Sequence, residues 1–386
     1  MTNARSWFIN ATMVFLSLIF AVGVSLGIEY GARTSWLFWV EHWTSDWRAK
    51  FLSNRPKGQH PKIAVVKVNE DTIQDYAYRT PIDRGLIARL ITVLDRAGVE
   101  AIAVDFLFLK ETEPAKDEAL IQAIKAAKTR VVLAVADKRV GLSDAQQAYQ
   151  RSFIERSGAT PGFANLLTAA DGVVRFIAPQ ADKDYPKSLA VAAAKPDAEI
   201  PDGPRRIAWL LRPEDGNERF LELPAHLLAA PAGKAAPPTV AALSALLRGR
   251  IVFIGAELIG IDRHLTPLAS WKNDNEVPGV IVHTHVAAQL LDDRSVTRVP
   301  TAIMRFVYAL ITFLGICVVL RYSSIGYSLY FSIITLTIAG ADILLFIFTS
   351  QFLPFGACLA AAAAGLLGGI VMRYVVRLFQ TASQTS

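Results

Sequence analysis

The chain has only two cysteines, Cys317 and Cys358, and both lie in long apolar stretches. The charged middle of the chain therefore has to fold without disulfides, which a large domain can do because it buries enough apolar surface. Familiar catalytic motifs are missing too. No strand is followed by a Walker loop or a G-x-G-x-x-G turn, no helix carries His-Glu-x-x-His, and no Ser or Cys occupies a nucleophile elbow. The sequence thus lacks the usual signatures of a nucleotide-binding or hydrolytic enzyme.

Charge is almost absent from the two ends of the chain. Outside residues 29–298 there are five of the 40 Lys and Arg, one of the 34 Asp and Glu, and none of the six His. The middle stretch holds 35 basic and 33 acidic residues, so the sequence pI of 9.3 does not reflect a basic domain, and a nucleic-acid partner is not indicated. This layout predicts a water-exposed domain held to a lipid bilayer at both ends.

Four apolar segments are long enough to cross that bilayer, since a membrane helix needs about 20 residues. The first, 7–28, is longer than the apolar core of a cleaved signal peptide, about 7–15 residues, so we interpret it as a retained helix. The predicted organisation is a membrane helix in 1–28, an exported domain in 29–298, three membrane helices in 299–372 and a short tail in 373–386. The three later helices are expected at 301–320, 327–349 and 354–372.

The short connections predict the orientation. Arg5, Arg321, Arg373 and Arg377 fall on one side of the membrane under a four-helix topology, and the loop 350–353 has no Lys or Arg. Because basic residues in short loops stay on the cytoplasmic side, both termini are expected there. The domain 29–298 is then on the opposite side.

Within that domain, short β-branched runs alternate with amphipathic stretches. Strands are predicted at 63–68, 101–106, 130–136 and 250–255, and helices at 84–97, 116–127 and 280–291. This alternation is typical of βαβ units, so the fold class is predicted as α/β, a Rossmann-like and mostly parallel sheet, plus four transmembrane helices. Before it, tryptophans at 36, 39, 43 and 47 follow the period of one helix face, and we expect that face to pack on the domain or on the bilayer surface.

The order of several short motifs resembles the CHASE sensory domain of type two, an extracytoplasmic input module of bacterial membrane-bound cyclases and kinases. The residues that carry the resemblance are 46–48, 63–71, 98–108, 162–165, 171–175, 185–190, 249–256, 262–267 and 278–285. The segment 78–84 departs from the family, which often has a Trp-Pro-rich turn there. The resemblance implies a periplasmic sensory domain on a bacterial inner membrane, usually followed by three membrane helices.

Family members commonly continue into a catalytic domain, whereas this chain stops soon after its last membrane segment. We therefore expect a sensor or adaptor that passes its signal to a membrane or periplasmic protein partner. A homo-oligomer is compatible with this expectation, and the ligand and any cofactor are unknown. Two alternatives stay open: a periplasmic metal-dependent enzyme, and a structural subunit of an envelope complex.

Polar residues gather where the predicted strands end. Ligands of parallel α/β sheets bind outside the carboxyl ends of strands. Three candidates lie at a strand end or in the loop after a strand, and two begin the next helix. These candidates are Asp105, Asp262, His264, His283 and His285. Carboxylate and imidazole groups suit a ligand or a metal, but the same groups also cap helices and fill polar holes, and residues 283 and 285 cannot face one point from a helix.

One carboxylate lies inside a membrane segment. Asp342 would be costly there unless paired, and we expect Arg305 to be its partner. The small residues of 360–369 would let another helix approach closely, so we predict that this face contacts a membrane partner.

Overall fold

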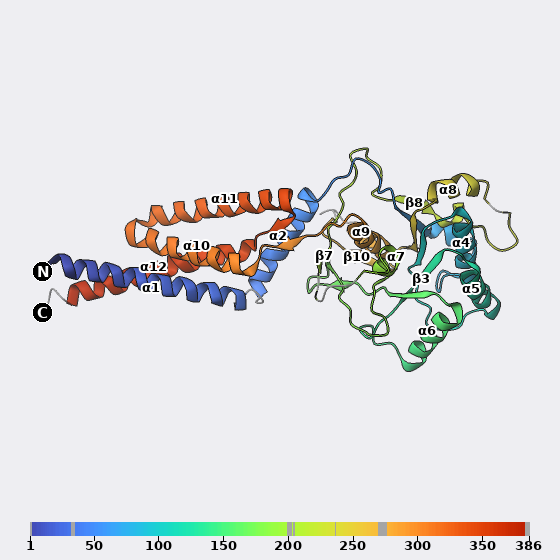
Figure 1. The fold of residues 1–386 in the computed structure, drawn as a ribbon, viewed down its shortest axis with the longest axis horizontal. Coiled ribbons are helices and arrows are strands. Elements are labelled where there is room, and N and C mark those ends of the chain that lie inside the picture. Colours follow the sequence, from blue (N-terminus) through green and yellow to red (C-terminus); the bar gives the residue numbers. More distant parts are fainter. Residues whose placement is uncertain are drawn as a thin grey trace. The chain divides into compact units, whose positions relative to one another are not determined.

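The computed structural model describes residues 2–31, 35–198, 203, 205–235, 237–268 and 276–382. The side chains of residues 2–11, which include Arg5, and of Trp36 lie outside the described ones. The chain divides into two compact units (Figure 1). Residues 1–52 and 296–386 form the helical unit, and residues 53–295 form the sheet unit.

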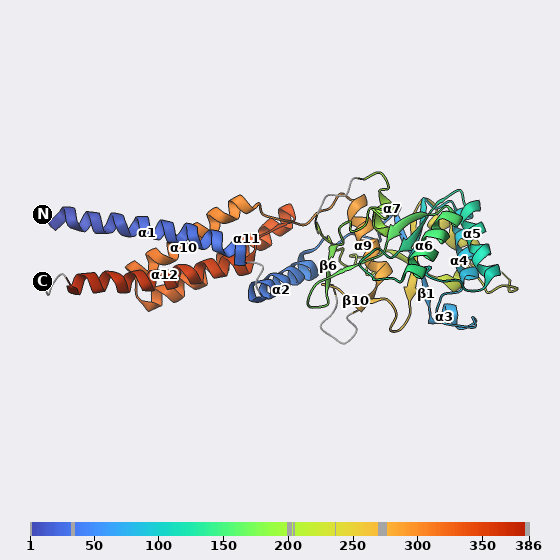
Figure 2. The same ribbon diagram turned by 90° about the horizontal axis from the view of Figure 1, so that it is seen from below.

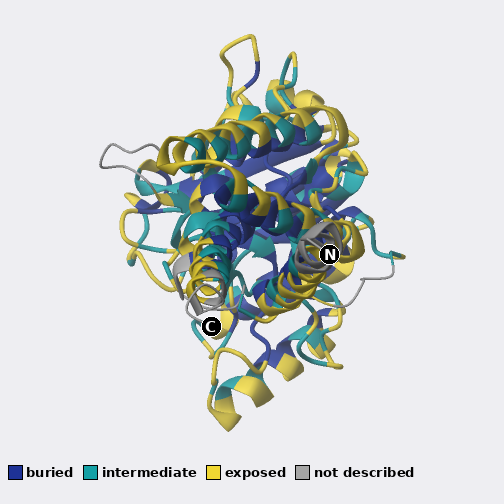
Figure 3. Cartoon of the chain, turned by 90° about the vertical axis from the view of Figure 1, so that its left-hand side faces the viewer, coloured by how far each residue is buried: buried dark blue, intermediate teal, exposed yellow. Residues whose placement is uncertain are grey.

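The sheet unit contains a six-stranded, all-parallel sheet, as predicted. Its order is β4-β3-β2-β9-β1-β8. The strands are β1 (Ile63–Asn69), β2 (Ala101–Val104), β3 (Arg130–Val135), β4 (Thr160–Phe163), β8 (Leu221–Pro224) and β9 (Ile251–Glu257). Val, Ile, Leu and Ala fill most of these strands because both faces of a parallel sheet are covered. The interior strands are drawn as buried in Figure 3.

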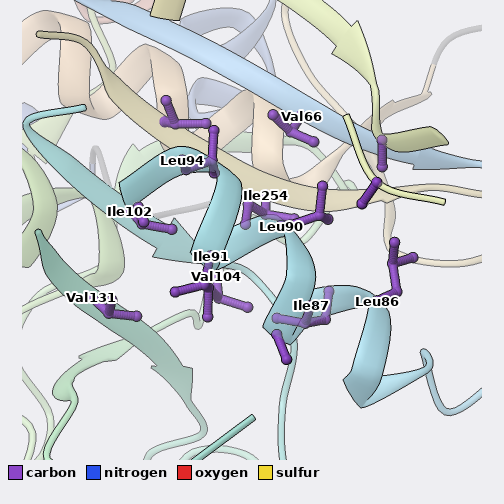
Figure 4. Packing of buried hydrophobic residues seen from close by; sticks show 14 of the residues in the cluster. Val66, Leu86, Ile87, Leu90, Ile91, Leu94, Ile102, Val104, Val131 and Ile254 are labelled. Carbon is purple, nitrogen blue, oxygen red and sulfur yellow. The ribbon is translucent and has the colours of Figure 1, made fainter. Parts of the chain in front are cut away.

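One face of the sheet is covered by α4 (Arg84–Ala97), α5 (Pro114–Ala126) and α6 (Asp144–Ser157). Alternate strand residues such as Val66, Ile102 and Ile254 point to this face, where Leu86, Ile87, Leu90, Ile91 and Leu94 of α4 pack on them (Figure 4). Asp83 caps α4, because its Oδ1 accepts a hydrogen bond from the Leu86 amide at 2.8 Å.

The opposite face is covered by α7 (Leu189–Ala194) and α9 (Gly279–Leu291) (Figures 1 and 2). The approach of α9 to β9 is close: a Cβ on Gly255 would lie 2.4 Å from Cβ of Val280. A glycine at this strand position is therefore what allows the helix to pack there. The helix that follows β2, α5, and the helix that follows β9, α9, thus lie on opposite faces of the sheet.

Shorter elements surround this core. They are α3 (Glu70–Ile73), β5 (Leu167–Thr168), β6 (Val174–Ile177), β7 (Arg205–Arg206), the 3-10 turn η1 (Ala225–Leu227), α8 (Val240–Leu247), β10 (Arg263–Leu265) and β11 (Glu276–Pro278). Strands β10 and β11 pair antiparallel, with His264 opposite Val277. This small hairpin precedes α9 directly in the chain, so it positions the first turn of that helix.

The helical unit contains α1 (Thr2–Gly31), α2 (Ser35–Leu52), α10 (Thr301–Arg321), α11 (Ser324–Thr349) and α12 (Phe355–Ala382). Four segments of these helices, 12–31, 301–321, 324–349 and 355–378, are long and apolar enough to span a membrane, which confirms the predicted number and order. Many of their apolar side chains are exposed, as in lipid-facing helices. Figure 3 colours much of these helices as exposed.

Helices α10 and α12 pack through small residues. A Cβ on Gly365 would lie 2.4 Å from the carbonyl oxygen of Thr312, and the hydroxyl of Thr312 donates to the Ala361 carbonyl at 3.1 Å. Gly315 faces Gly365 across the same contact. The face of 360–369 that we assigned to another membrane chain is therefore used inside this one, because α10 already provides the close neighbour that small residues permit.

The predicted pair of Asp342 and Arg305 is wrong. Asp342 binds Arg48 of α2, with 2.5 Å between Oδ2 and Nη1, and its Oδ1 accepts from the Leu353 amide at 2.8 Å. Both side chains of the ion pair are almost fully buried, at 3% and 8% exposed. Arg305 instead pairs with Glu29 of α1 at 2.9 Å. Asp342 lies near the C-terminal end of α11, next to α2, so a residue outside the four membrane segments neutralises it.

Helix α2 has an exposed aromatic face. Trp39, Trp43 and Trp47 are exposed at the four-residue spacing of one helix face, while Arg48 on another face is buried against α11. The carboxylate of Glu41 accepts a hydrogen bond from the Ala357 amide in the first turn of α12 at 3.3 Å. Helix α2 is therefore bound to the C-terminal part of α11 and to the start of α12.

Candidate functional site

The candidate site lies at the carboxyl edge of the sheet, between β2 and β9. These strands are neighbours, but the helices that follow them cover opposite faces. Such a change of direction opens a crevice outside the strand ends, where ligands of open α/β sheets bind. Asp105 follows β2 directly, and its amide donates to the Ile254 carbonyl of β9 at 2.8 Å.

A cavity of about 360 Å³ occupies this crevice. Its wall is mostly apolar and comes from the loops that follow four strands, together with the start of α4. The lining residues are Thr80, Pro81, Ile82, Arg84, Ile87, Asp105, Phe106, Leu107, Phe108, Val135, Ala136, Val140, Ala164, Asn165, Ala256, Leu258, Ile261, Asp262 and His283. Three of the five predicted site residues, Asp105, Asp262 and His283, thus line one cavity.

Asp105 is the most unusual of them. Its side chain is 7% exposed, and within the described part of the chain its Oδ2 has no hydrogen-bond partner. Burial, with a contribution from the charge of Asp262, raises the pKa of this carboxyl well above its usual range. Leaving a buried acceptor unpaired costs about 1–3 kcal/mol, so the fold maintains this group at a cost in stability.

Asp262 approaches the cavity from the loop after β9. Its backbone is left-handed, with φ of 49°, and its Oδ1 lies 2.8 Å from Nε2 of His264. A Cβ on Gly279 would lie 2.4 Å from Oδ2 of Asp262, and the Gly279 amide donates to the Asp262 carbonyl at 3.0 Å. Burial raises the pKa of Asp262, but the interactions with His264, His283 and Gly279 together lower it below the usual value. Asp262 is therefore the ionised carboxylate of the site.

His283 lies in α9 and is buried. Its Nε2 is 3.8 Å from Oδ1 of Asp105, too far for a hydrogen bond, and its ring hydrogen-bonds the backbone of Ala164. Burial lowers the pKa of His283 to about 4, although the charge of Asp262 opposes the shift. The imidazole is thus neutral at physiological pH and contributes a polar edge, not a positive charge.

His264 and His285 do not line the cavity. His264 lies on β10 and reaches the site only through Asp262. His285 points to another side of α9, where its ring packs edge-on against Trp209 and Phe220, with centroids 4.9 Å and 5.1 Å away, and its Nδ1 accepts from the Leu210 amide at 3.3 Å. Side chains two residues apart on a helix point about 200° apart, so His285 and His283 cannot contribute to one site from α9.

Arg84 is a lining residue that the sequence did not single out. Its side chain is 3% exposed and forms an ion pair with Asp117 at 2.8 Å. It also donates to the Tyr149 hydroxyl at 2.8 Å and lies over the rings of Phe108 and Phe153. The available signal was an arginine in the first turn of an amphipathic helix, where a positive charge opposes the helix dipole and therefore needs a partner.

The site does not present a set of metal ligands. Among the residues that the structure describes, no group of three or more His, Cys, Asp and Glu side chains is arranged to hold a metal ion. Asp262 is engaged by His264, and Asp105 is separated from His283 by 3.8 Å. What the arrangement offers chemically is a mostly apolar cavity, partly open to solvent, with two carboxyl groups and one neutral imidazole on its wall.

The comparisons with known proteins agree with this architecture. Neither a curated protein nor a solved structure matches the sequence. The family model of the CHASE2 domain matches residues 15–323. This range includes the whole sheet unit, together with residues 15–52 and 296–323 of the helical unit. The family is an extracytoplasmic sensory domain, and the resemblance noted in the sequence is confirmed. The chain therefore belongs to the CHASE2 domain family, with one N-terminal and three C-terminal membrane-spanning segments around its sensory domain.

Proposed function

We propose that this protein is a bacterial inner-membrane sensor that binds a small solute in the cavity at the carboxyl edge of its periplasmic sheet and passes the bound state to a protein partner. Both termini are cytoplasmic in this proposal. The observation that carries it is the cavity of about 360 Å³ at the point between β2 and β9, with Asp105 on its wall. The buried Oδ2 of Asp105 has no hydrogen-bond partner among the residues that the structure describes. Ligand sites of this size with few polar groups are typical of small-molecule binding, about 300–1,000 Å³.

The route of the signal follows the two chain connections between the units. Helix α2 (Ser35–Leu52) precedes the sheet unit, and Arg48 holds it to Asp342 of α11. The strand β12 (Thr297–Arg298) follows the sheet unit and pairs in parallel with β13 (Gln351–Phe352), which comes directly after α11. Both connections are thus anchored at the same end of α11, and Arg48 also lies over the Phe352 ring at 5.0 Å.

The partner is proposed to contact the outward face of α11. Apolar side chains along this helix are exposed throughout its length, with Ile325, Leu336 and Phe348 each more than 70% exposed. A ligand shifts a conformational equilibrium only by its differential affinity for the two states, so the readout has to be a contact that differs between the empty and the filled protein. A second copy of the chain at this face would serve as well as a different protein.

The test is a pair of matched substitutions in the full chain, with cellular output as the readout. Leu107→Trp enlarges an exposed side chain that lines the cavity and should abolish ligand-dependent output. Leu246→Trp makes the same change at an exposed position of α8 that does not line the cavity, and it should leave output unchanged. Photo-crosslinking from position 336 would capture the partner. Normal signalling by Leu107→Trp would contradict a sensing role for the cavity. Normal signalling by that variant, together with loss of an envelope complex when the chain is deleted, would favour the structural-subunit alternative.

A further inference from the structure

Among the described residues that line the cavity, the groups that are free to meet a ligand's charge are acidic. Asp105 and Asp262 are acidic, His283 is neutral, and the remaining charged lining residue is Arg84. Arg84 is fully engaged: it pairs with Asp117 at 2.8 Å, donates to Tyr149 and to the Lys110 carbonyl, and is 3% exposed. An anionic ligand would therefore meet two carboxyl groups and no available counter-charge.

Asp105 provides the point of attachment. Asp105 lines the cavity, and its buried Oδ2 has no partner within the described residues, so a donor supplied by the ligand would remove the cost of the unpaired acceptor. The charge of Asp262 acts on Asp105 and makes the local potential negative. A charged donor gains from that potential, whereas a neutral hydroxyl gains little, and hydrogen bonds to charged groups are the stronger ones.

The rest of the wall selects the body of the ligand. Most of the remaining wall is apolar, with Ile82, Ile87 and Phe106 on one part and Val135, Leu258 and Ile261 on another. Its other polar side chains, apart from the engaged Arg84, are Thr80, Asn165, Asp262 and His283. Burying a polar group without a partner is costly, so a compact apolar body is preferred. An amino acid is disfavoured because its carboxylate would meet the two carboxyl groups of the wall without a counter-charge.

We propose that the cavity binds a small organic amine in its protonated form, with the ammonium group against Asp105 and an apolar body against the wall. This inference rests on the proposed sensory function of the same cavity and names the chemical class of its ligand.

Three probes with one phenyl-alkyl body and different head groups separate the possibilities. They are phenethylamine, 2-phenylethanol and 3-phenylpropanoate, titrated calorimetrically into the full chain in lipid nanodiscs at neutral pH. Phenethylamine should bind at least tenfold more tightly than the alcohol, and the carboxylate should not bind. Equal binding of all three, preference for the alcohol or the carboxylate, or no binding of the amine at millimolar concentration would each overturn the amine proposal.

The variant that tests the attachment point is Asp105→Asn, which removes the acidic group that can ionise beside an ammonium and keeps the shape. It should lose the tenfold preference for the amine while still binding the alcohol, so alcohol binding also reports that the cavity is intact. Asp144→Asn, at an exposed carboxylate outside the cavity, is the matched control and should behave as the wild type. If Asp105→Asn destabilises the fold, Asp105→Ser, with a smaller polar side chain, replaces it and has to show the same loss.

The two proposals fail separately. An unchanged amine preference in Asp105→Asn overturns Asp105 as the attachment point, and a wild-type chain that does not prefer the amine overturns the amine class. Unaffected signalling by Leu107→Trp overturns the sensory role of the cavity, whatever the head group that it binds.

Discussion

At the residue scale, the site depends on glycines as much as on its charged side chains. The loop that carries Asp262 passes so close to α9 that only a hydrogen atom fits at position 279. Strand β9 and α9 meet with the same tightness at Gly255 and Val280. The carboxyl of Asp262 is therefore positioned by backbone packing, and its hydrogen bond to His264 adds to a geometry that already exists.

Replacing Gly279 with Ala should disturb the site directly. The new Cβ would lie 2.4 Å from Oδ2 of Asp262, so the loop or the helix has to move, at a cost of about 1–3 kcal/mol for overpacking. Gly58→Ala is the control, because its Cβ would meet Oδ2 of Asp215 at an ordinary 3.5 Å and no positive φ is recorded there. Urea unfolding of the full chain in detergent measures both. Equal stability of the two variants would contradict the close approach.

Protonation of His283 should make the sheet unit weaken in acid. Its pKa is about 4 in the folded chain and near 6.5 when unfolded, so between these values the unfolded chain binds a proton that the folded one does not. Stability from this residue is complete above about pH 6.5 and falls as the pH drops toward 4, by on the order of 3 kcal/mol in total.

Asp105 acts in the opposite direction, because a carboxyl whose pKa is raised in the folded state favours folding as the pH falls. The contribution of His283 to the pH dependence of stability is therefore obtained by comparing the wild type with a variant that lacks this histidine. Urea unfolding between about pH 7 and pH 4, compared for the wild type and His283→Gln, should give a shallower pH dependence in the variant. Parallel curves would mean that His283 is not buried in its neutral form.

At the element scale, α2 is joined to the membrane helices by one buried ion pair. Arg48 and Asp342 are 3% and 8% exposed, and Asp342 also accepts the Leu353 amide. The pair from α1 and α10, Glu29 and Arg305, has the same chemistry but a far more exposed arginine, at 52%. The buried pair should affect the free energy of unfolding more than the exposed pair, because water screens the exposed charges.

Breaking the buried pair should therefore be costly. Arg48→Met leaves Asp342 buried with an uncompensated charge, and we expect a loss of about 3–5 kcal/mol. The double variant Arg48→Met with Asp342→Leu should recover most of it, because no buried charge remains. Arg305→Met is the control and should cost at most about 1 kcal/mol. Unfolding of the full chain by SDS, followed by circular dichroism, measures all three; a double variant no more stable than Arg48→Met would show that the ion pair is not the cause.

At the scale of the whole molecule, the four membrane segments and the extracytoplasmic domain fix the number of crossings, and basic residues predict the direction. Arg321 lies in the short connection between α10 and α11, and Arg373 and Arg377 lie in the last turns of α12. The connection between α11 and α12 contains no Lys or Arg. The two sides of the membrane therefore differ in charge in the way that predicts cytoplasmic termini.

A reporter that is active only in the cytoplasm should function when fused after Ser386 and fail when inserted next to Gly233 and Lys234. The second position is a turn of the sheet unit with a positive-φ glycine, and an insertion there should be tolerated. A reporter active only in the periplasm should give the reverse result. Cytoplasmic activity at position 233 would overturn both the orientation and the periplasmic sensory role.

The sequence by itself determined the organisation of the chain. Charge segregation and segment length located the four membrane helices, because lipid excludes charge and sets the length of a crossing. Strand and helix alternation determined a parallel sheet, and the general rule for such sheets directed attention to Asp105, Asp262 and His283 at the strand ends. Each of these conclusions uses a property that is local in the chain or common to the whole fold class.

Only the tertiary structure decided which side chains meet. Arg48 and Asp342 are almost 300 positions apart, and Arg305 was the nearer guess because it too lies in a membrane segment. The small residues of 360–369 indicated a close helix contact, but not that α10 of the same chain supplies it. His285 differs from His283 only by its angle around α9, and Arg84 reaches the cavity only because the start of α4 forms part of its wall. Pairing between distant segments depends on how whole elements pack, and no local pattern of residues records that geometry.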